Sequence, residues 1–323
     1  MIIDFHGHFY PRFYLEKLAA RPKEPYLRAD NNNRKYIYQN NYGFGPIEDS
    51  VFDVRKRIED LDKAGIDKQV LSVSMPGVDF LNGAESAVLS RKINEEVAGM
   101  CSQHPRLIGL ACIGLKEQNS AVREMERSVN ELGIRGVSLF THVNGTYLDS
   151  KRFWPFFKKA EELQVPIFVH PGVPKKFKDY EDYRLFSVLG LMDEITLCVV
   201  RMIYGGVLAV FPSLRLIFTH LGGSVPFLFR RVERGAYLLG KKMGDSVVFN
   251  LQKMHFDTVS FYAPALQCAI DTIGTDKMLM GSDYPFAAGS LEEAVQSINA
   301  LDITEEDKKK ILYENALNIL KIN

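Results

Sequence analysis

Eight short apolar runs alternate along the chain with longer segments of helical periodicity. Most of the runs are almost wholly apolar, as expected for parallel strands that are covered on both faces. The predicted strands are residues 1–6, 69–75, 107–113, 136–140, 166–170, 214–220, 256–259 and 277–281. Between them, apolar residues recur at three- and four-residue spacing, which predicts helices. The predicted helices are residues 51–64, 86–103, 120–132, 153–163, 194–211, 225–239, 263–273 and 305–320.

Two α/β architectures accommodate this alternation. One is a (β/α)₈ barrel, and the other is an open, doubly wound sheet. A doubly wound sheet would usually carry a glycine-rich phosphate turn after an early strand, and the sequence has no such turn. We therefore predict one barrel domain over residues 1–323, a length that is normal for this fold.

One segment, at about residues 10–50, interrupts the alternation. It shows no clear helical period and is rich in Tyr, Asn and Pro. Within it, residues 34–39 and 42–45 flank Asn40 and Asn41, which predicts a two-residue hairpin turn because Asn tolerates positive φ. Since the segment follows the first strand, we expect a small insertion or lid at the C-terminal face of the barrel.

Charge and composition exclude several classes of partner. Lys and Arg together number 40, as do Asp and Glu, so the formal net charge is zero and nucleic acid is not an expected partner. No apolar run approaches the roughly 18 residues needed to cross a bilayer, and the first residues lack the features of a signal peptide. The four cysteines lie far apart and predict core positions in a reducing compartment. We therefore expect a cytoplasmic protein without a membrane partner.

Four of the seven histidines end predicted strands. His6 and His8 close the first strand, and side chains two apart on a strand point to the same side. His170 ends the run PIFVH, His220 ends LRLIFTH, and Asp283 follows KMLMG. A histidine that closes a buried strand is costly unless it is paired or ligated. Because barrel active sites form at the C-terminal strand ends, these five residues predict a functional site.

The residue types at these positions suggest a metal centre. Three imidazoles and one carboxylate suit a borderline divalent ion, with Zn²⁺ the expected one and Mn²⁺, Fe²⁺ or Co²⁺ as alternatives. The remaining imidazole is then free to act as a general acid or base. Beside the seventh strand, Asp257 is a candidate to orient a ligand from behind, with packing or capping as the alternative role.

Four motifs carry a resemblance to a known family. They are DFHGHFYPR, PIFVHPG, FTHLGGSVPFLFRRVER and MLMGSDYPF, and their order and spacing extend over almost the entire chain. Together they resemble the amidohydrolase superfamily, and in particular the branch that contains aminocarboxymuconate-semialdehyde decarboxylase and related non-oxidative decarboxylases. The resemblance implies a distorted (β/α)₈ barrel.

The resemblance also implies roles for the site residues. It makes His6, His8, His170 and Asp283 the metal ligands and His220 the uncoordinated catalytic histidine. Many binuclear relatives carry a bridging lysine at the end of the fourth strand. Here that strand reads RGVSLFTH and has no lysine, which implies a single metal ion.

Substrate-binding residues follow less directly from the resemblance. Arg231 matches an arginine that a neighbouring subunit donates to a substrate carboxylate, which implies a homodimer; a guanidinium can clamp a carboxylate in bidentate fashion. The alternative is that Arg231 belongs to a solvated charged helix face. Arg34 is the nearest candidate for a second carboxylate-binding arginine, and His142 follows the fourth strand and could face the pocket.

These features lead to a functional expectation with two alternatives. The expected function is non-oxidative decarboxylation of a small unsaturated or aromatic carboxylate, with His220 moving the proton. The first alternative uses the same site, with Asp283 or His220 as proton shuttle, for a hydrolase or hydratase of an ester, lactone, amide or unsaturated acid. The second is a non-catalytic metal-binding protein, although a structural zinc site has no use for a fifth group.

Overall fold

Eight parallel strands form the central sheet of the computed structural model, which describes residues 1–174, 177–238 and 247–322. Their spatial order follows the chain, so each strand pairs with the strand of this sheet that comes next in the sequence. The strands are β1 (Ile3–His8), β5 (Lys68–Ser72), β6 (Leu107–Cys112), β7 (Gly136–Phe140), β10 (Ile167–His170), β11 (Leu216–Phe218), β12 (His255–Asp257) and β13 (Met278–Leu279).

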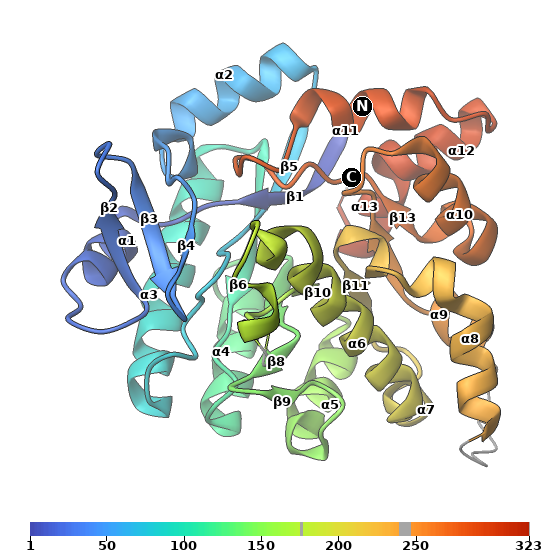
Figure 1. The fold of residues 1–323 in the computed structure, drawn as a ribbon, viewed down its shortest axis with the longest axis horizontal. Coiled ribbons are helices and arrows are strands. Elements are labelled where there is room, and N and C mark those ends of the chain that lie inside the picture. Colours follow the sequence, from blue (N-terminus) through green and yellow to red (C-terminus); the bar gives the residue numbers. More distant parts are fainter. Residues whose placement is uncertain (175–176, 239–246, 323) are drawn as a thin grey trace.

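Backbone hydrogen bonds join the first strand to the last. The amide of Phe5 donates to the carbonyl of Met280, and the amide of His8 donates to the carbonyl of Tyr284, each over 2.8 Å. Gly7 forms a further parallel bridge to Tyr284. These bonds close the sheet, and the predicted (β/α)₈ barrel is confirmed (Figure 1).

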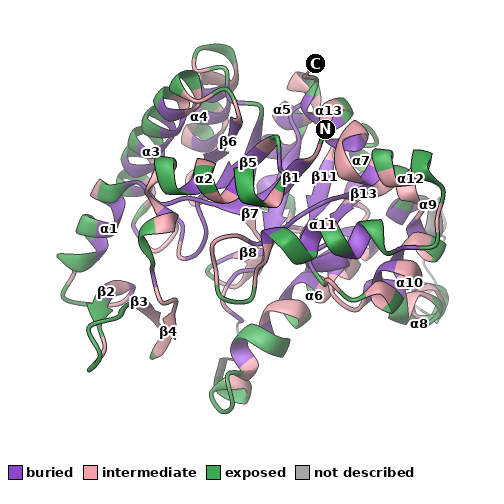
Figure 2. Ribbon diagram, turned by 90° about the horizontal axis from the view of Figure 1, so that it is seen from above, coloured by how far each residue is buried: buried purple, intermediate pink, exposed green. Residues whose placement is uncertain are grey.

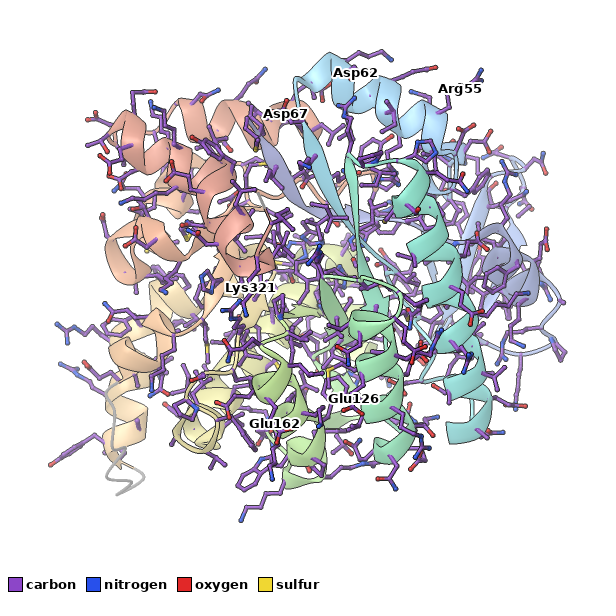
Figure 3. The ribbon with its side chains drawn as sticks, turned by 180° about the vertical axis from the view of Figure 1, so that it is seen from behind. Arg55, Asp62, Asp67, Glu126, Glu162 and Lys321 are labelled. Carbon is purple, nitrogen blue, oxygen red and sulfur yellow. The ribbon has the colours of Figure 1, made fainter. Side chains whose placement is uncertain are left out.

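Helices surround the barrel, with buried residues on their inner faces and exposed residues on their outer faces (Figure 2). The principal ones are α2 (Val54–Ala64), α3 (Gly83–Gln103), α4 (Gln118–Asn130), α5 (Trp154–Leu163), α6 (Leu191–Tyr204), α8 (Val225–Leu238), α10 (Ala263–Ile273) and α11 (Leu291–Asn299). In α2, the side chain of Asp53 caps the amide of Lys56, and Gly65 ends the helix with a φ of 69°. Charged side chains such as Arg55 and Asp62 of α2 and Glu162 of α5 project away from the barrel (Figure 3).

Apolar side chains fill the interior of the barrel beside the strand starts. Ile3, Phe5 and Phe168 belong to a buried cluster that also includes residues of α13 (Asn315–Leu320). Because Ile319 and Leu320 of this last helix pack against the strand residues, α13 closes the end of the barrel opposite the predicted site.

The segment between β1 and α2 forms a small α/β insertion. Its antiparallel strands are β2 (Tyr26–Ala29), β3 (Lys35–Gln39) and β4 (Tyr42–Phe44), and they lie to one side of the barrel (Figure 1). The predicted hairpin is confirmed, since Asn40 and Asn41 have φ of 52° and 61°. The prediction missed α1 (Arg12–Ala19), a helix of only eight residues, which is too short to show a clear period.

Other differences from prediction are α11, which no predicted helix covers, and interruptions of two predicted helices. The predicted helix over 194–211 is divided into α6 and α7 (Val207–Val210), because Gly206 adopts a φ of 70° between them. The last predicted helix comprises α12 (Glu305–Lys309), a π-helical turn (Lys310–Glu314) and α13. The helix predicted over residues 225–239 corresponds to α8, and its predicted last residue, 239, lies outside the described residues. Among the described residues, no helix is long and apolar enough to span a membrane.

Candidate metal centre

A bulge in β1 directs two successive residues into the barrel. Asp4 pairs with Gln69 but Gly7 pairs with Leu71, so β1 has one residue more than β5 over this stretch. Phe5 lies in the interior cluster, and the rings of Phe5 and His6 lie 6.0 and 5.1 Å from the ring of Phe168. The bulge therefore shifts the alternation of β1, so that a strand with an apolar interior side can end in two inward-facing histidines.

The structure brings the four expected ligands together. One side-chain nitrogen or oxygen from each of His6, His8, His170 and Asp283 lies within 4.8 Å of all the others. His8 Nε2 is 2.9 Å from His6 Nε2 and 3.0 Å from Asp283 Oδ1. All four residues are buried. Two imidazole nitrogens at this separation and a carboxylate oxygen are suitably placed for one divalent ion, so the donor set fits a single metal.

The second nitrogen of each ligand histidine is already occupied. His6 Nδ1–H donates to Asp257 Oδ2 over 2.6 Å, and His170 Nδ1–H donates to the carbonyl of Pro171 over 3.0 Å. His8 Nδ1 lies 3.1 Å from Ser72 Oγ. For His6 and His170 these contacts select the tautomer that leaves the Nε2 lone pair facing the centre, which is the usual arrangement around a bound metal. Asp257 thus lies where the sequence placed a candidate orienting residue.

Burial keeps these imidazoles neutral at physiological pH. It lowers the pKa of His6 and of His8 to about 3, and it lowers the pKa of His220 to about 4. The same desolvation raises the pKa of Asp257 to about 6. Neutral imidazoles retain the lone pair that a metal ligand needs.

A buried polar chain supports the bulge from the outer side of the barrel. Asp4 accepts hydrogen bonds from the amide of His6 over 3.0 Å and from Gln69 Nε2 over 2.7 Å. Arg57 of α2 donates to Gln69 Oε1 over 2.7 Å and also to the carbonyl of His8. Gly7 permits this approach, because a Cβ there would lie 2.6 Å from Gln69 Cδ. These buried hydrogen bonds were not predicted from the sequence, where Asp4 at the start of the motif DFHGH was the one available signal.

His220 and Asp283 both have left-handed backbone conformations. Their φ angles are 53° and 57°, which non-glycine residues seldom adopt. The amide of His220 donates to Asp257 Oδ1 over 2.7 Å, so Asp257 holds both a ligand histidine and the backbone of His220. The rings of His220 and His6 lie 5.2 Å apart. Strained backbone of this kind is concentrated at functional sites.

A cavity of about 430 Å³ opens above the cluster. His170, His220 and Asp283 contribute to its inner end. Its walls are largely apolar and come from several loops; they include Phe44, Met75, Phe186, Leu191, Phe261 and Phe286. A concave apolar site with a few convergent polar groups is what a small organic substrate requires.

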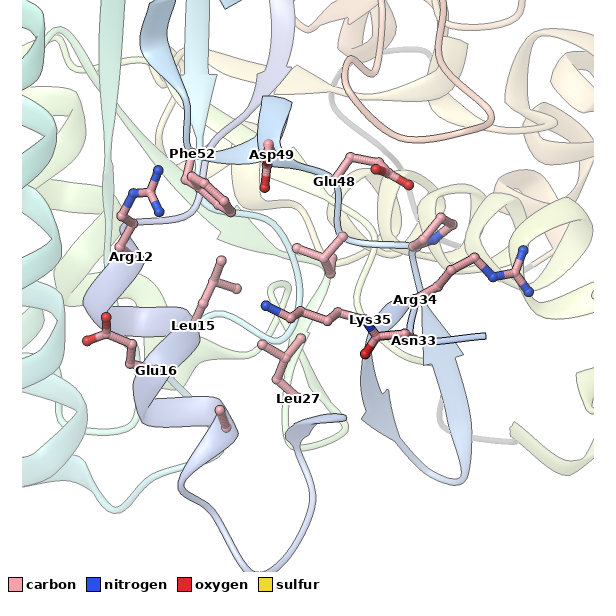
Figure 4. Close-up of a pocket in the computed structure, with 13 residues that line it drawn as sticks. Arg12, Leu15, Glu16, Leu27, Asn33, Arg34, Lys35, Glu48, Asp49 and Phe52 are labelled. Atoms are coloured by element: carbon pink, nitrogen blue, oxygen red, sulfur yellow. The ribbon is translucent and has the colours of Figure 1, made fainter. Parts of the chain in front are cut away.

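The three residues predicted to bind substrate lie outside this cavity. Arg34 forms a two-bond ion pair with Asp30 and borders a different hollow of about 440 Å³, where its side chain points away from Arg12 (Figure 4). His142 donates through Nε2 to the carbonyl of Val173 over 2.8 Å and borders a third hollow. Arg231 is exposed on α8. The structure therefore does not bring these three side chains to the metal centre within one chain.

Residues 3–322 match the Amidohydrolase family, and the chain belongs to it. The resemblance seen in the four motifs is thereby confirmed, and the chain is an enzyme of the amidohydrolase type. The chain is 28% identical over 335 residues to 2-amino-3-carboxymuconate-6-semialdehyde decarboxylase of Dictyostelium discoideum, with 99% of this chain and 92% of that protein covered. It is 28% identical over 308 residues to gamma-resorcylate decarboxylase of a Polaromonas species, with 87% and 93% covered.

A solved structure shows the same fold. The dihydroxybenzoic acid decarboxylase of Polaromonas, determined with bound manganese and the inhibitor 2-nitroresorcinol, superposes with a TM-score of 0.82 at 24% identity and covers 99% of this chain and 96% of its own. A further relative is a 2-keto-4-carboxy-3-hexenedioate hydratase of Sphingobium, which is 24% identical over 352 residues, with 99% of this chain and 96% of that protein covered. Both lyase chemistries considered from the sequence thus occur among its relatives.

Proposed function

We propose that this protein is a metal-dependent non-oxidative decarboxylase of a small aromatic or unsaturated carboxylate. The observation that carries the proposal is the placement of a fifth imidazole, His220, beside the His6, His8, His170 and Asp283 cluster at the inner end of an apolar cavity. The decarboxylases among the relatives support the same reaction class.

In this proposal the four clustered residues hold one divalent ion. We propose Zn²⁺, with Mn²⁺, the ion in the Polaromonas structure, as its direct competitor. When bound, the ion would supply Lewis-acid polarisation of a substrate oxygen. Metal analysis of the purified protein, followed by reconstitution with each ion, decides between the two.

His220 is proposed to move the proton that replaces the carboxylate. Because burial keeps the resting imidazole neutral, His220 takes this proton up from solvent during the reaction and passes it to the substrate. A proton is added to the carbon that bears the carboxylate, the bond from that carbon to the carboxylate breaks, and its electron pair stays on the carbon. The net change is R–COO⁻ + H⁺ → R–H + CO₂, and His220 is neutral again once it has passed the proton on. Asp257 fixes the backbone of His220 through its amide, which keeps the imidazole beside the cluster.

We further propose a homodimer. Because Arg231 is exposed on α8 and lies outside the cavity of its own chain, it could contact substrate only in the site of a second copy. Exposed apolar side chains accompany it on the same helix, with Phe227 and Tyr237 83% and 84% exposed. Large exposed apolar residues of this kind are typical of association surfaces. The oligomeric state in solution is tested by analytical ultracentrifugation.

Two measurements, CO₂ release and metal content, test the catalytic proposal. Metal-loaded protein should release CO₂ from hydroxybenzoates or unsaturated acids, and His220→Asn should keep its metal content while losing most of that activity. Loss of the metal in His220→Asn would instead make His220 a ligand. If no such acid loses CO₂ but an unsaturated acid is hydrated, or an ester is cleaved, the decarboxylase proposal is wrong and the hydratase or hydrolase alternative replaces it.

A further inference from the structure

A fixed positive charge borders the mouth of the active-site cavity within a single chain. Among the described residues that line it, Arg184 is the only Lys or Arg. The predicted clamps Arg34 and Arg231 are not part of this lining. Arg184 is exposed, whereas His170, His220 and Asp283 are buried, so the cation lies at the open end and the metal centre at the closed end.

The backbone that carries Arg184 is anchored to the insertion. Arg184 follows Tyr183 in the left-handed region, with φ of 58° and 50°, and its carbonyl accepts the amide of Ser187 over 3.0 Å. Next in the chain, the ring of the fully buried Phe186 lies 4.5 Å from that of Tyr42 of β4. Tyr42 Oη is 2.7 Å from Ser187 Oγ. Arg184 therefore lies on a braced segment rather than on a free loop.

The chemistry of the reaction limits what this guanidinium can bind. Guanidinium groups recognise carboxylates through two parallel charge-assisted hydrogen bonds. The carboxylate that is lost must lie at the closed end, where His220 can protonate its carbon. A cation that stabilised that same carboxylate would stabilise the reactant more than the transition state, which would slow the reaction. The group that meets Arg184 is therefore one that the product keeps.

We propose that Arg184 binds a second carboxylate of the substrate, so that the preferred substrate is an aromatic or unsaturated dicarboxylate. This inference rests on the proposed function for the identity of the reacting end. Arg184 is thereby a residue that determines substrate specificity, and the rest of the cavity supplies apolar contact for the carbon skeleton.

Two matched acids test the inference in binding experiments. The probes are 4-hydroxyisophthalate and 2-hydroxybenzoate, which differ by the distal carboxylate, and titration calorimetry with metal-loaded protein measures their affinities without requiring turnover. We expect the wild-type protein to favour the dicarboxylate by about 10-fold or more. Arg184→Met should abolish this preference while changing the affinity for 2-hydroxybenzoate by no more than about twofold, and Arg184→Lys should retain part of it.

The outcomes separate this inference from the proposed function. Arg230→Met, which removes an exposed arginine of α8, is the matched control and should keep the wild-type preference. A wild-type protein without preference for the dicarboxylate, or an Arg184→Met variant that weakens both acids equally, overturns the role of Arg184. A preference that depends on Arg184 in a protein that releases no CO₂ from either acid supports the binding role while contradicting the decarboxylase.

Discussion

The two ends of the active-site cavity are constructed on different principles. At the inner end, His6 and His8 are fully buried and have both ring nitrogens in polar contacts. At the mouth, Tyr183 is 91% exposed and Arg184 projects from a segment braced by one aromatic cluster and one side-chain hydrogen bond. The inner end is therefore suited to hold one geometry. Side chains at the mouth can be substituted without disturbing that geometry, and substitution of this kind lets barrels of one fold accept different substrates.

The largest expected effect is at the inner end. His170→Ala removes one of the four clustered donor atoms, so the purified variant should lose its metal on dialysis. Metal affinity and CO₂ release should both fall by more than the roughly 10–100-fold that follows loss of an outer partner. His104→Ala, at the end of α3, is the control and should bind metal normally. A His170→Ala variant with wild-type metal content would remove His170 from the ligand set.

The next largest effect concerns the buried chain behind β1. Arg57→Met leaves the carbonyl of His8 and Gln69 Oε1 without their donor and the buried Asp4 without a nearby cation. Urea unfolding should show a loss of about 3–5 kcal/mol in the free energy of unfolding. Arg55→Met, on the exposed side of the same helix, should change it by no more than about 0.5 kcal/mol. Equal effects of the two substitutions would show that the buried hydrogen bonds of Arg57 do not stabilise the bulge.

A moderate effect is expected from Asp257→Asn. If the side-chain oxygen of the new Asn accepts from the backbone N–H of His220, its NH₂ group lies against His6 Nδ1–H. If that oxygen instead accepts from His6, the backbone N–H of His220 loses its acceptor. Affinity for Mn²⁺ or Zn²⁺, measured by calorimetry, should fall by about 10–100-fold because the tautomer of His6 is no longer fixed. Ser260→Ala, at the cavity wall, should leave metal affinity unchanged. Unchanged affinity in Asp257→Asn would mean that packing alone orients His6.

The smallest effect is expected at the mouth. Tyr42→Phe removes the hydroxyl that contacts Ser187 and should cost about 0.5–1.5 kcal/mol. Hydrogen exchange should become faster at the amides of residues 186–190 and stay unchanged in the barrel strands. Tyr38→Phe, on the neighbouring strand β3, is the control. Faster exchange throughout the barrel would show that the two ends of the cavity are not independent.

Much of the barrel and its metal centre was visible in the sequence because both depend on local patterns. Apolar runs mark the strands, and the residue that ends each run falls on the C-terminal face of the barrel. This is why the sequence indicated that His170 and His220 lie close together. The shift in β1 could not be predicted, since a bulge depends on how β1 registers with β5.

The arginines show the limit of sequence reasoning more clearly. Arg34 was expected at the substrate because it follows the first strand, yet it pairs with Asp30 and borders a different hollow, outside the active-site cavity. Arg184 carries no sequence signal, because its position depends on a loop that packs against β4 from far along the chain. Loop placement of this kind is set by tertiary contacts and not by local periodicity.

The closure of the barrel between β1 and Tyr284 also sets the order of assembly during synthesis. His8 and Asp283 are 275 residues apart in the chain, yet their ligand atoms lie 3.0 Å apart. A growing chain on the ribosome presents three of the four clustered histidine and aspartate donors long before it presents the last. The complete donor set therefore exists only after all eight barrel strands have been made.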